Sequence, residues 1–328
     1  MKKYNVCILG ASGVVGRTFL EVLEEVNFPV GELKLLASSR SAGTVLQFKG
    51  KDYVVEEVNE HSFDGFDIGL FSPGASVSKI YAPIAQKAGC VVIDNTSAFR
   101  ELKEIPLVVP EVNSDDIALN NGIIANPNCS TIQSVIPLKA LRDRFGLKKV
   151  CYTTYQAVAG SGIKGINDLE RTRKGLDPEF YPYNISSTCI PEIDIPMENG
   201  YTKEEMKMVN ETRKILHLND LPVSATCVRV PILRSHAVSM SIILDKKFTL
   251  DEVRECLMSQ EGVVLVDDLP NHLYPTQIMS TGNNMVYVGR LRYDLANENG
   301  LLLYCTADNI RRGAASNAVF IAQKLIMK

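Results

Sequence analysis

The sequence opens with a short apolar run that ends in a glycine-rich turn, YNVCILGASGVVG. Gly10, Gly13 and Gly16 follow a run typical of a buried strand and precede a helix-like segment. Glycines here allow a tight turn and let backbone amides of the helix N-terminus approach a pyrophosphate. The turn therefore predicts a dinucleotide-binding strand–turn–helix unit. The alternative is a turn that only packs the helix on the strand, because the spacing is GxxGxxG rather than GxGxxG.

The first 126 residues alternate apolar runs with helix-period segments. Buried strands are expected at residues 4–10, 33–38, 66–72, 89–94, 105–110 and 122–126. Helical periodicity appears between several of them, at residues 18–26 and 77–89. Apolar strands that alternate with helices predict an α/β fold with a Rossmann-type doubly wound parallel sheet.

From about residue 148 the pattern changes to longer strands with alternating apolar and polar positions. Such strands are expected at residues 148–158, 223–234, 236–245, 284–294 and 300–308, and helices at 163–174, 202–216 and 249–259. Alternation favours a half-exposed, mostly antiparallel sheet, so the second domain is predicted to be α+β. The last segment carries an apolar stripe, Ala315, Val319, Ala322 and Ile326, which predicts a helix packed on a sheet.

The end of the second expected strand bears on the choice of dinucleotide. An enzyme that uses NAD usually has Asp or Glu there to bind the ribose hydroxyls. Here the chain reads Ser38, Ser39, Arg40 and Ser41 instead. Hydroxyl donors and a guanidinium suit the 2′-phosphate of NADP, so NADP is favoured over NAD. The alternative is a solvated loop that merely contains Arg40.

Cys129 lies in the segment NPNCST, directly before a helical pattern. Ile132, Val135, Leu138, Leu141 and Phe145 mark one side of that helix, and Pro137 is expected to kink it. A thiol at a helix N-terminus is stabilised as the thiolate, and the same amides suit an oxyanion formed at an attacked carbonyl. Cys129 is therefore a candidate nucleophile. The alternative is an inert cysteine, the expected fate of the other seven.

A catalytic thiol needs an acid–base partner, and the chain has four histidines. His61 and His272 lie in polar, loop-like stretches, and His217 lies near an expected helix end. His236 stands at the start of an expected strand. Elimination favours His236, although a histidine in such a place is more often structural.

Composition excludes several classes of protein. The net charge of −3 and pI of about 5.9 give no basic surface for nucleic acid. No apolar stretch has the length of a membrane helix. The eight cysteines form no CxxC pair and no metal-ligand spacing, so no metal is predicted, and several lie in apolar runs. A reducing cytoplasm is the expected location.

The motifs together resemble one enzyme family, the aspartate-β-semialdehyde dehydrogenases, in their bacterial branches. They occur in the family's order as GASGVVG, ASSRSAG, FSPGASVS, NTSAFR, NPNCST, YQAVAGSG, ETRKIL, VRVPILRSH, YVGRLRYD and DNIRRGAASNAV. The resemblance covers nearly the whole chain. It implies NADPH-dependent reduction of L-4-aspartyl phosphate to aspartate semialdehyde and phosphate, in the biosynthesis of lysine, threonine, methionine and isoleucine.

The resemblance also implies roles for individual residues. Cys129 matches the nucleophile, His236 the general acid–base, and Gln156 the residue that orients the substrate. The remaining positions match substrate contacts: Arg229 for the α-carboxylate, Glu211 for the amino group, Lys214 and Arg100 for phosphate, and Asn128 beside the nucleophile. Without the resemblance, Glu211 and Lys214 would be an exposed helix pair, and Arg100 a loop charge.

Cofactor contacts are implied in four parts of the chain. They are Gly10, Ser12, Gly13, Val14, Val15, then Ser38, Ser39, Arg40, Ser41, then Ser72, Gly74 and Asn95, and finally Ser161, Gly162, Asn309 and Gly313. The implied domains are residues 1–128 for NADP, completed by a C-terminal helix at 309–328, and residues 129–308 for catalysis and dimerisation. A homodimer is implied, with a tetramer as the alternative.

Two segments depart from the family pattern. HAVS replaces HSES or HSQ after the histidine, and YPTQIMSTG replaces a more acidic version. Several rival functions stay open. They are N-acetyl-glutamyl-phosphate reductase, which has HPGCY, glyceraldehyde-3-phosphate dehydrogenase, which has SCTTN, a non-catalytic NADP-binding paralogue, and a cysteine hydrolase. None of these rivals accounts for all the motifs at once.

Overall fold

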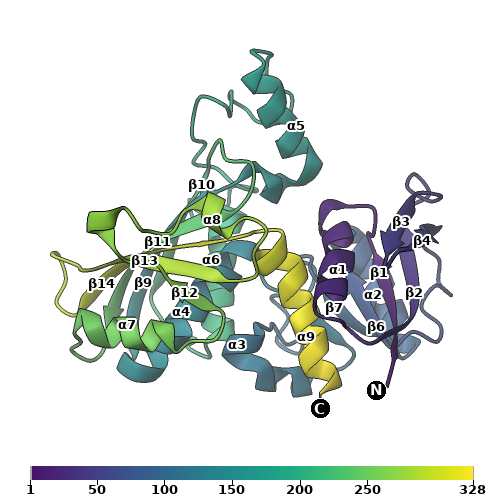
Figure 1. Ribbon diagram of the computed structural model, residues 1–328, viewed down its shortest axis with the longest axis horizontal. Coiled ribbons are helices and arrows are strands. Elements are labelled where there is room, and N and C mark those ends of the chain that lie inside the picture. The colour runs from purple at the N-terminus through teal and green to yellow at the C-terminus, as the bar shows by residue number, and fades with distance from the viewer. Residues whose placement is uncertain (1, 328) are drawn as a thin grey trace. The chain divides into compact units, whose positions relative to one another are not determined.

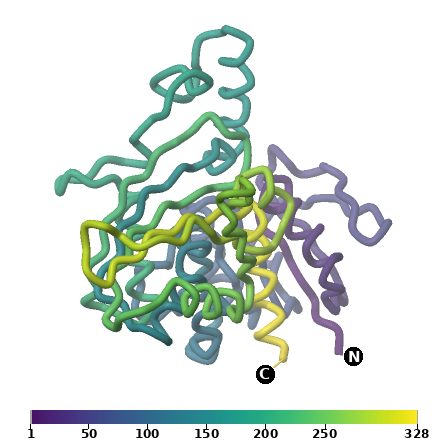
Figure 2. Tube along the Cα trace, turned by 60° about the vertical axis from the view of Figure 1, so that its left-hand side comes forward, coloured from purple at the N-terminus to yellow at the C-terminus, as the bar shows by residue number. Residues whose placement is uncertain are grey.

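A computed structural model describes residues 2–327 and divides the chain into two compact units. The first unit comprises Met1–Pro127 and Ala314–Lys328, and the second comprises Asn128–Gly313 (Figures 1 and 2). Within residues 2–327, no helix combines the length and the apolar character needed to cross a membrane. Each unit has its own sheet and is described by itself.

The first unit is built on a six-stranded parallel sheet in the order β5-β2-β1-β6-β7-β8. The strands are β1 (Tyr4–Leu9), β2 (Val30–Ala37), β5 (Glu56–Glu57), β6 (Ile68–Phe71), β7 (Val91–Asp94) and β8 (Ile123–Ala125), beside a separate hairpin of β3 (Val45–Phe48) and β4 (Lys51–Val54). This order is the 3-2-1-4-5-6 arrangement of the Rossmann sheet. The predicted fold class is therefore confirmed for this unit.

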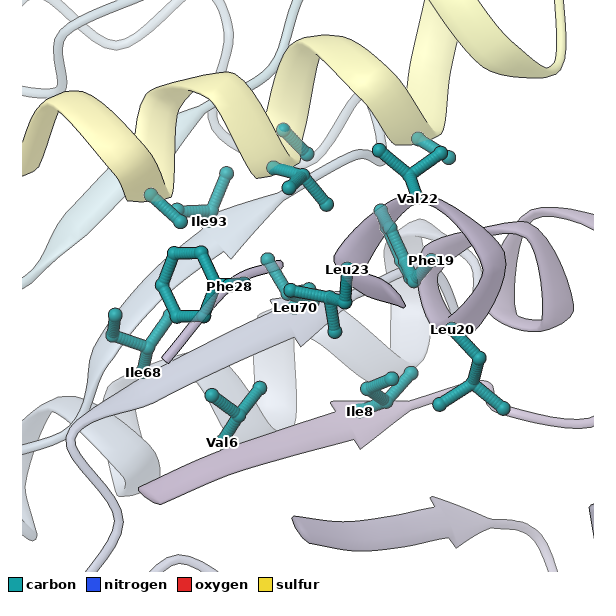
Figure 3. Packing of buried hydrophobic residues seen from close by; sticks show 14 of the residues in the cluster. Val6, Ile8, Phe19, Leu20, Val22, Leu23, Phe28, Ile68, Leu70 and Ile93 are labelled. Atoms are coloured by element: carbon teal, nitrogen blue, oxygen red, sulfur yellow. The ribbon is translucent and has the colours of Figure 1, made fainter. Parts of the chain in front are cut away.

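Helices complete the first unit and bury its core. They are α1 (Val14–Glu25), α2 (Ala75–Lys87), α3 (Pro110–Asn113), the 3₁₀ turn Ser114–Leu119 and α9 (Ser316–Ile326). Val6 and Ile8 of β1 pack with Phe19 and Leu23 of α1 in one apolar cluster (Figure 3). The predicted stripe of α9 lies in or against the same cluster, so its packing on the first sheet is confirmed.

The strand predicted at residues 105–110 is wrong. Only Leu107 forms a bridge, with Ala125, and Pro110 begins helix α3. Pro106 and Pro110 have no N–H to donate to a ladder. In addition, the N–H of Val109 donates to the side chain of Asn113 rather than to a strand. The segment therefore touches the sheet edge once and then turns into a helix.

The second unit is built on a mixed sheet in the order β10-β9-β11-β14-β13-β12. Its strands are β9 (Leu147–Gln156), β10 (Val223–Arg229), β11 (His236–Leu244), β12 (Val263–Leu265), β13 (Val286–Tyr293) and β14 (Gly300–Ala307). The three central pairs are antiparallel, and the two outer pairs are parallel. The predicted mostly antiparallel sheet is confirmed, with parallel pairing at both edges.

Helices of the second unit lie mainly against this sheet. They are α4 (Cys129–Phe145), α5 (Gly162–Arg173), α6 (Lys203–Ile215), α7 (Leu250–Met258) and α8 (Gln277–Ser280), with 3₁₀ turns at Val158–Ser161 and Leu269–Asn271. Helix α4 contacts β9, β11, β13 and β14 as well as α6 and α7. It is therefore buried on nearly all sides, whereas the sequence predicted one apolar side.

The chain returns to the first unit later than predicted. Asn309 and Gly313 belong to the second unit, and a π-helical turn at Arg311–Ala315 precedes α9. The predicted helix at 309–328 therefore begins several residues late. The reason is local, because the side chain of Asn309 binds Ser235 and Gly313 packs against Cys129, both in the second unit.

Candidate active site

The predicted cofactor residues of the first unit lie at one edge of its sheet. Gly10 follows β1, Ser38 follows β2, Ser72 follows β6 and Asn95 follows β7. The strands are parallel and adjacent, so their carboxyl ends meet at the same edge. Ligands of open α/β sheets bind at this edge. Ser12, Gly13, Val14 and Val15 belong to the turn and first helical residues after β1.

Gly10 shows why the turn after β1 needs glycine. Its φ is 87°, and a Cβ placed there would lie 2.7 Å from the carbonyl oxygen of Ser72. Its N–H donates to the carbonyl of Leu36 at 2.8 Å, which fixes the turn against β2. Helix α1 then begins after Gly13, and no side chain caps its N-terminus. A helix N-terminus without a side-chain cap is a common anion-binding site.

The loop after β2 is exposed. Ser38, Ser39 and Arg40 are exposed, and Ser41 is partly exposed. The loop is folded back by a hydrogen bond from the N–H of Ser41 to the carbonyl of Ser38 at 2.9 Å. Hydroxyls and a guanidinium are thus displayed at the carboxyl edge of the first sheet, beside the glycine turn.

Arg100 is buried in the first unit, contrary to the loop charge that its sequence alone suggested. Its Nε donates to the carbonyl of Asn126 at 2.8 Å, and its Nη2 donates to the carbonyl of Asn95 at 2.9 Å. The side chain of Asn126 donates to Asn95 Oδ1 and accepts from Asn317 Nδ2. This buried network fixes the ends of β7 and β8 together.

Three predicted site residues of the second unit meet where its strands end. Gln156 ends β9 and Arg229 ends β10, and the two are register partners in a parallel pair. The antiparallel strand β11 begins at His236, next to the end of β9. All three side chains are buried. The topology therefore gathers an amide, a guanidinium and an imidazole at one edge of the sheet.

The hydrogen bonds of His236 determine its tautomer. Its Nδ1 accepts a hydrogen bond from the N–H of Ala157 at 2.9 Å, so the proton of the neutral ring resides on Nε2. Among the described residues, Nε2 has no partner. Complete burial, helped by the charge of Arg229, lowers the pKa of His236 to about 3. The ring is thus neutral at physiological pH and presents an N–H donor.

Cys129 is the first residue of α4 and is partly exposed. Asn128 caps the helix, and its Oδ1 accepts hydrogen bonds from the N–H groups of Ser130 and Thr131 at 2.9 and 3.3 Å. The N–H of Asn128 donates to Glu211 at 2.7 Å. Glu211 therefore lies at the start of α4, where it binds a backbone amide.

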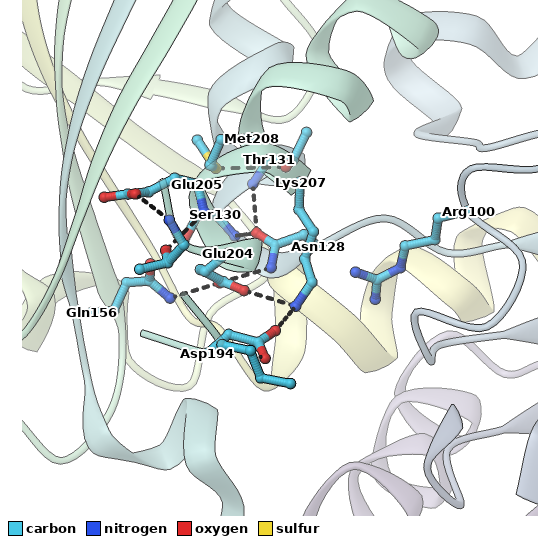
Figure 4. A network of polar contacts seen from close by, with 12 residues as sticks. Arg100, Asn128, Ser130, Thr131, Gln156, Asp194, Glu204, Glu205, Lys207 and Met208 are labelled. Carbon is cyan, nitrogen blue, oxygen red and sulfur yellow. Dashed lines mark hydrogen bonds and ion pairs between the residues drawn. The ribbon is translucent and has the colours of Figure 1, made fainter. Parts of the chain in front are cut away.

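Glu204 lies at the centre of a polar network that the sequence did not indicate (Figure 4). Its Oε1 accepts from Asn128 Nδ2 at 2.8 Å and from Gln156 Nε2 at 3.0 Å. Burial opposes ionisation, but the charge of Lys207 and these hydrogen bonds lower the pKa of Glu204 to about 2. An ionised carboxylate thus joins Asn128, the cap of α4, to the end of β9.

Lys207 carries the positive charge of this network. Its ammonium lies 3.0 Å from Glu204 Oε2 and 2.7 Å from Asp194 Oδ2. Burial opposes the charged form, but the charge of Glu204 raises the pKa of Lys207 above its usual value. Asp194 has a φ of 70°, an uncommon conformation for a residue other than glycine. Lys207 therefore stays charged beside the start of α4.

The remaining predicted cofactor residues lie in the second unit. Ser161 and Gly162 stand at the turn into α5, and Ser161 Oγ accepts from the hydroxyl of Tyr181 at 3.0 Å. A Cβ at Gly313 would lie 2.8 Å from the Cβ of Cys129, so only glycine fits behind Cys129 without displacing it. Asn309 is buried and binds the backbone of Ser235.

Comparison with known proteins places the chain in a family. Two family models match, the semialdehyde dehydrogenase NAD binding domain at residues 5–120 and the semialdehyde dehydrogenase dimerisation domain at residues 138–312. An aspartate-semialdehyde dehydrogenase of Aquifex aeolicus is 51% identical over 333 residues, which cover 98% of each chain. The chain belongs to the aspartate-semialdehyde dehydrogenase family. The predicted family and its class, an oxidoreductase, are confirmed.

Other members of the aspartate-semialdehyde dehydrogenase family are similar throughout. The Bacillus subtilis enzyme is 47% identical over 335 residues, 98% of this chain and 97% of that protein. The crystal structure of aspartate semialdehyde dehydrogenase II from Vibrio cholerae has a TM-score of 0.97 at 46% identity and covers 100% of this chain and 99% of that one. The Candida albicans enzyme with NADP has a TM-score of 0.77 at 25% identity, with coverage of 99% and 100%.

Proposed function

We propose that this protein reduces L-4-aspartyl phosphate to L-aspartate 4-semialdehyde and phosphate with NADPH, through a thioester on Cys129. The observation that carries the proposal is the position of Cys129 at the capped start of α4, in the unit that also gathers Gln156, Arg229 and the neutral His236. Membership in the aspartate-semialdehyde dehydrogenase family supports the substrate.

The first unit fits a dinucleotide. The glycine turn after β1 keeps side chains away from the uncapped start of α1, which suits a pyrophosphate. The exposed Ser38, Ser39 and Arg40 suit the 2′-phosphate of NADP, and no Asp or Glu stands there for the bare diol of NAD. When bound, NADPH supplies the hydride that reduces the thioester carbonyl. Ser161, Gly162 and Gly313 stay predicted contacts of the same cofactor.

In the proposed first step, the Cys129 thiolate attacks the acyl carbon of the substrate. The new bond joins sulfur to this carbon, and the bond from the carbon to the phosphate oxygen breaks, so phosphate leaves with the electron pair. The N-terminal position of Cys129 favours the thiolate and offers backbone amides to the oxyanion. After hydride addition, the carbon–sulfur bond breaks, which releases the aldehyde and restores the thiolate.

His236 is proposed to donate Nε2–H to the oxygen that becomes negative. This role follows from its tautomer, because Nδ1 already accepts the N–H of Ala157. A full proton transfer, the general acid–base role that the sequence suggested, would require the ring to be charged, and its pKa of about 3 opposes that. We propose the hydrogen-bond donor as the resting role.

The substrate is proposed to be held by Arg229 at its α-carboxylate and by Glu204 at its amino group. We assign this role to Glu204 rather than to Glu211 because Glu204 binds the side chains of Asn128 and Gln156 directly. Lys207 similarly replaces Lys214 for phosphate. Lys214 follows Lys207 by seven residues, about 10 Å along a helix. Arg100 stays a predicted phosphate contact.

Glu204→Gln and Glu211→Gln separate the two assignments. Glu204→Gln is expected to raise the KM for aspartate semialdehyde about 10-fold or more, because the neutral amide no longer attracts the ammonium group. Glu211→Gln keeps an acceptor for the N–H of Asn128, so a KM change below about threefold is expected. Steady-state kinetics of both variants measure this. A larger KM increase in Glu211→Gln than in Glu204→Gln would instead assign the binding of the amino group to Glu211.

We propose a homodimer formed through the second sheet, with a tetramer as the alternative. Cys151, Thr153, Tyr155, Ser239 and Tyr304 occupy alternate positions on one face and are partly or fully exposed, whereas the residues between them are buried. The match to a dimerisation domain supports a partner for this unit, and we propose that the partner binds this face. Sedimentation as a single species with the mass of one chain would rule the dimer out.

The proposed location is the cytoplasm. All eight cysteines are free thiols in the structure, and the proposed nucleophile must stay reduced. Recovery of the protein outside the cytoplasm after cell fractionation would contradict this location.

The reverse reaction tests the function. Aspartate semialdehyde, phosphate and NADP should give NADPH, and both phosphate and the semialdehyde should be required. Replacing phosphate by sulfate, or NADP by NAD, should reduce the rate strongly. If the folded protein formed no NADPH under these conditions, the assignment of aspartate semialdehyde as the substrate would be wrong.

A further inference from the structure

The backbone just before β11 adopts an unusual conformation. His236 pairs with Ala307 of β14, whereas Ser235, one residue earlier, has a φ of 72°. Serine rarely adopts this left-handed region, and Ser235 is completely buried. Such a conformation persists only where surrounding contacts hold it. The residue that precedes the site histidine is therefore held by its neighbours.

Asn309 provides the contact at this point. Its Oδ1 accepts a hydrogen bond from the N–H of Ser235 at 2.9 Å, and Asn309 is only 3% exposed. Strand β14 ends at Ala307, so a side-chain oxygen rather than a ladder carbonyl satisfies this N–H. A buried N–H that lost its acceptor would be left without a hydrogen bond, so this contact favours the observed conformation. Asn309 thus stabilises the left-handed turn directly.

Asp308 and the segment before β13 reinforce the turn. Asp308 is completely buried, pairs with Arg234 Nε at 2.8 Å and accepts the N–H of Gly282 at 2.7 Å. The hydroxyls of Ser235 and Thr281 lie 2.8 Å apart. Residues on both sides of the turn are therefore fixed to the end of β14 and to the segment that departs from the family pattern.

We infer that Asn309 is a positioning residue for His236. It keeps Ser235 in the left-handed conformation, and this conformation sets the direction in which the following imidazole leaves the backbone. In that direction Nδ1 meets the N–H of Ala157, which places the ring proton on Nε2. The inference rests on the proposed function for its catalytic consequence. It assigns Asn309 an action through His236, beyond the cofactor contact expected from the sequence.

Asn309→Ala and Asn309→Asp test this role. Aspartate keeps an oxygen that can accept the N–H of Ser235, and alanine removes it. Asn309→Ala is expected to lower kcat about 10- to 100-fold, the cost of a misplaced catalytic group, with the KM for NADP changed less than about twofold. Asn309→Asp is expected to recover most of kcat. In a His236→Ala background, Asn309→Ala should cause no further loss.

A second readout does not depend on activity. The chain has four histidines, so the ring signal of His236 can be assigned by NMR from its absence in His236→Ala. Asn309→Ala should shift this signal and leave those of the other three histidines in place, and Asn309→Asp should leave all four close to the wild-type positions. An unmoved His236 signal in Asn309→Ala would overturn the inference, even if the wild-type protein had no phosphate-dependent activity.

The kinetic results discriminate further. A higher KM for NADP with unchanged kcat in both variants would show a cofactor contact alone and would overturn the positioning role. A loss that adds fully to that of His236→Ala would show that Asn309 acts elsewhere. Absence of wild-type activity, with the NMR shift present, would instead remove the proposed function and leave the positioning of the ring intact.

Discussion

Cys129→Ala is expected to lower the rate of phosphate-dependent NADPH formation by about 10⁴-fold or more, because no thioester can form without the thiol. The measurement is the initial rate of NADPH formation from aspartate semialdehyde, phosphate and NADP. The free energy of unfolding should change little, since Cys129 is partly exposed. A variant that kept a tenth of the wild-type rate would exclude the covalent route.

Cys227→Ala is the matched control. Cys227 lies in β10 and is completely buried, and burial raises the pKa of its thiol, so it is not a nucleophile. Its replacement should leave the rate within about threefold of wild type, with a stability loss of roughly 1 kcal/mol for the lost packing. A similar loss of rate in both variants would mean that thiol replacement disturbs the unit generally.

His236→Ala is expected to lower kcat about 10²- to 10³-fold, the usual cost of removing one hydrogen-bond donor from an oxyanion. His236→Gln should recover part of this loss, because an amide also donates an N–H. The comparison separates the proposed donor from a proton relay. Two results together would favour proton transfer instead. The glutamine variant would be as slow as the alanine variant, and the pH profile of the wild-type kcat would follow a single ionisation.

The alanine variant should also change the pH dependence of stability. The folded-state pKa of His236 lies near 3, below the ordinary value of 6.5, so the unfolded chain binds the extra proton between these values. Wild-type stability therefore falls as the pH drops below about 6.5, by roughly 2 kcal/mol at about pH 5. His236→Ala should lack this part of the loss in urea unfolding. Equal losses in both proteins would contradict the buried, neutral ring.

Most of the fold could be predicted from the sequence because both sheets have strong hydrophobic patterns. Apolar runs with helices between them specify a parallel sheet, and alternating strands specify the second sheet. The exceptions have local causes. The run at 105–110 reads as a strand, but Pro106 and Pro110 interrupt its hydrogen bonding. The late return of the chain at Ala314 depends on the contacts of Asn309 and Gly313, which no pattern reveals.

The site was harder to predict because helix α6 contains two Glu–Lys pairs with the same spacing. Glu204 and Lys207 are three residues apart, as are Glu211 and Lys214, and the two pairs are separated by seven residues. Positions seven apart lie on the same helix face, so periodicity does not distinguish them. The proposed choice of Glu204 over Glu211 rests on tertiary contacts of Glu204 with Gln156 and Asn128. The left-handed backbone conformation of Ser235 likewise could not be predicted from the sequence.

The most direct test of the central claim is a single turnover without phosphate. Wild-type protein mixed with aspartate semialdehyde and excess NADP should form about one NADPH per chain, because the thioester then has no phosphate to accept its acyl group. The mass of the peptide that contains Cys129, measured after digestion, should show one added aspartyl acyl group. Added phosphate should release this group as turnover resumes. Continuous NADPH formation without phosphate, or an unmodified Cys129 after the burst, would contradict the covalent mechanism.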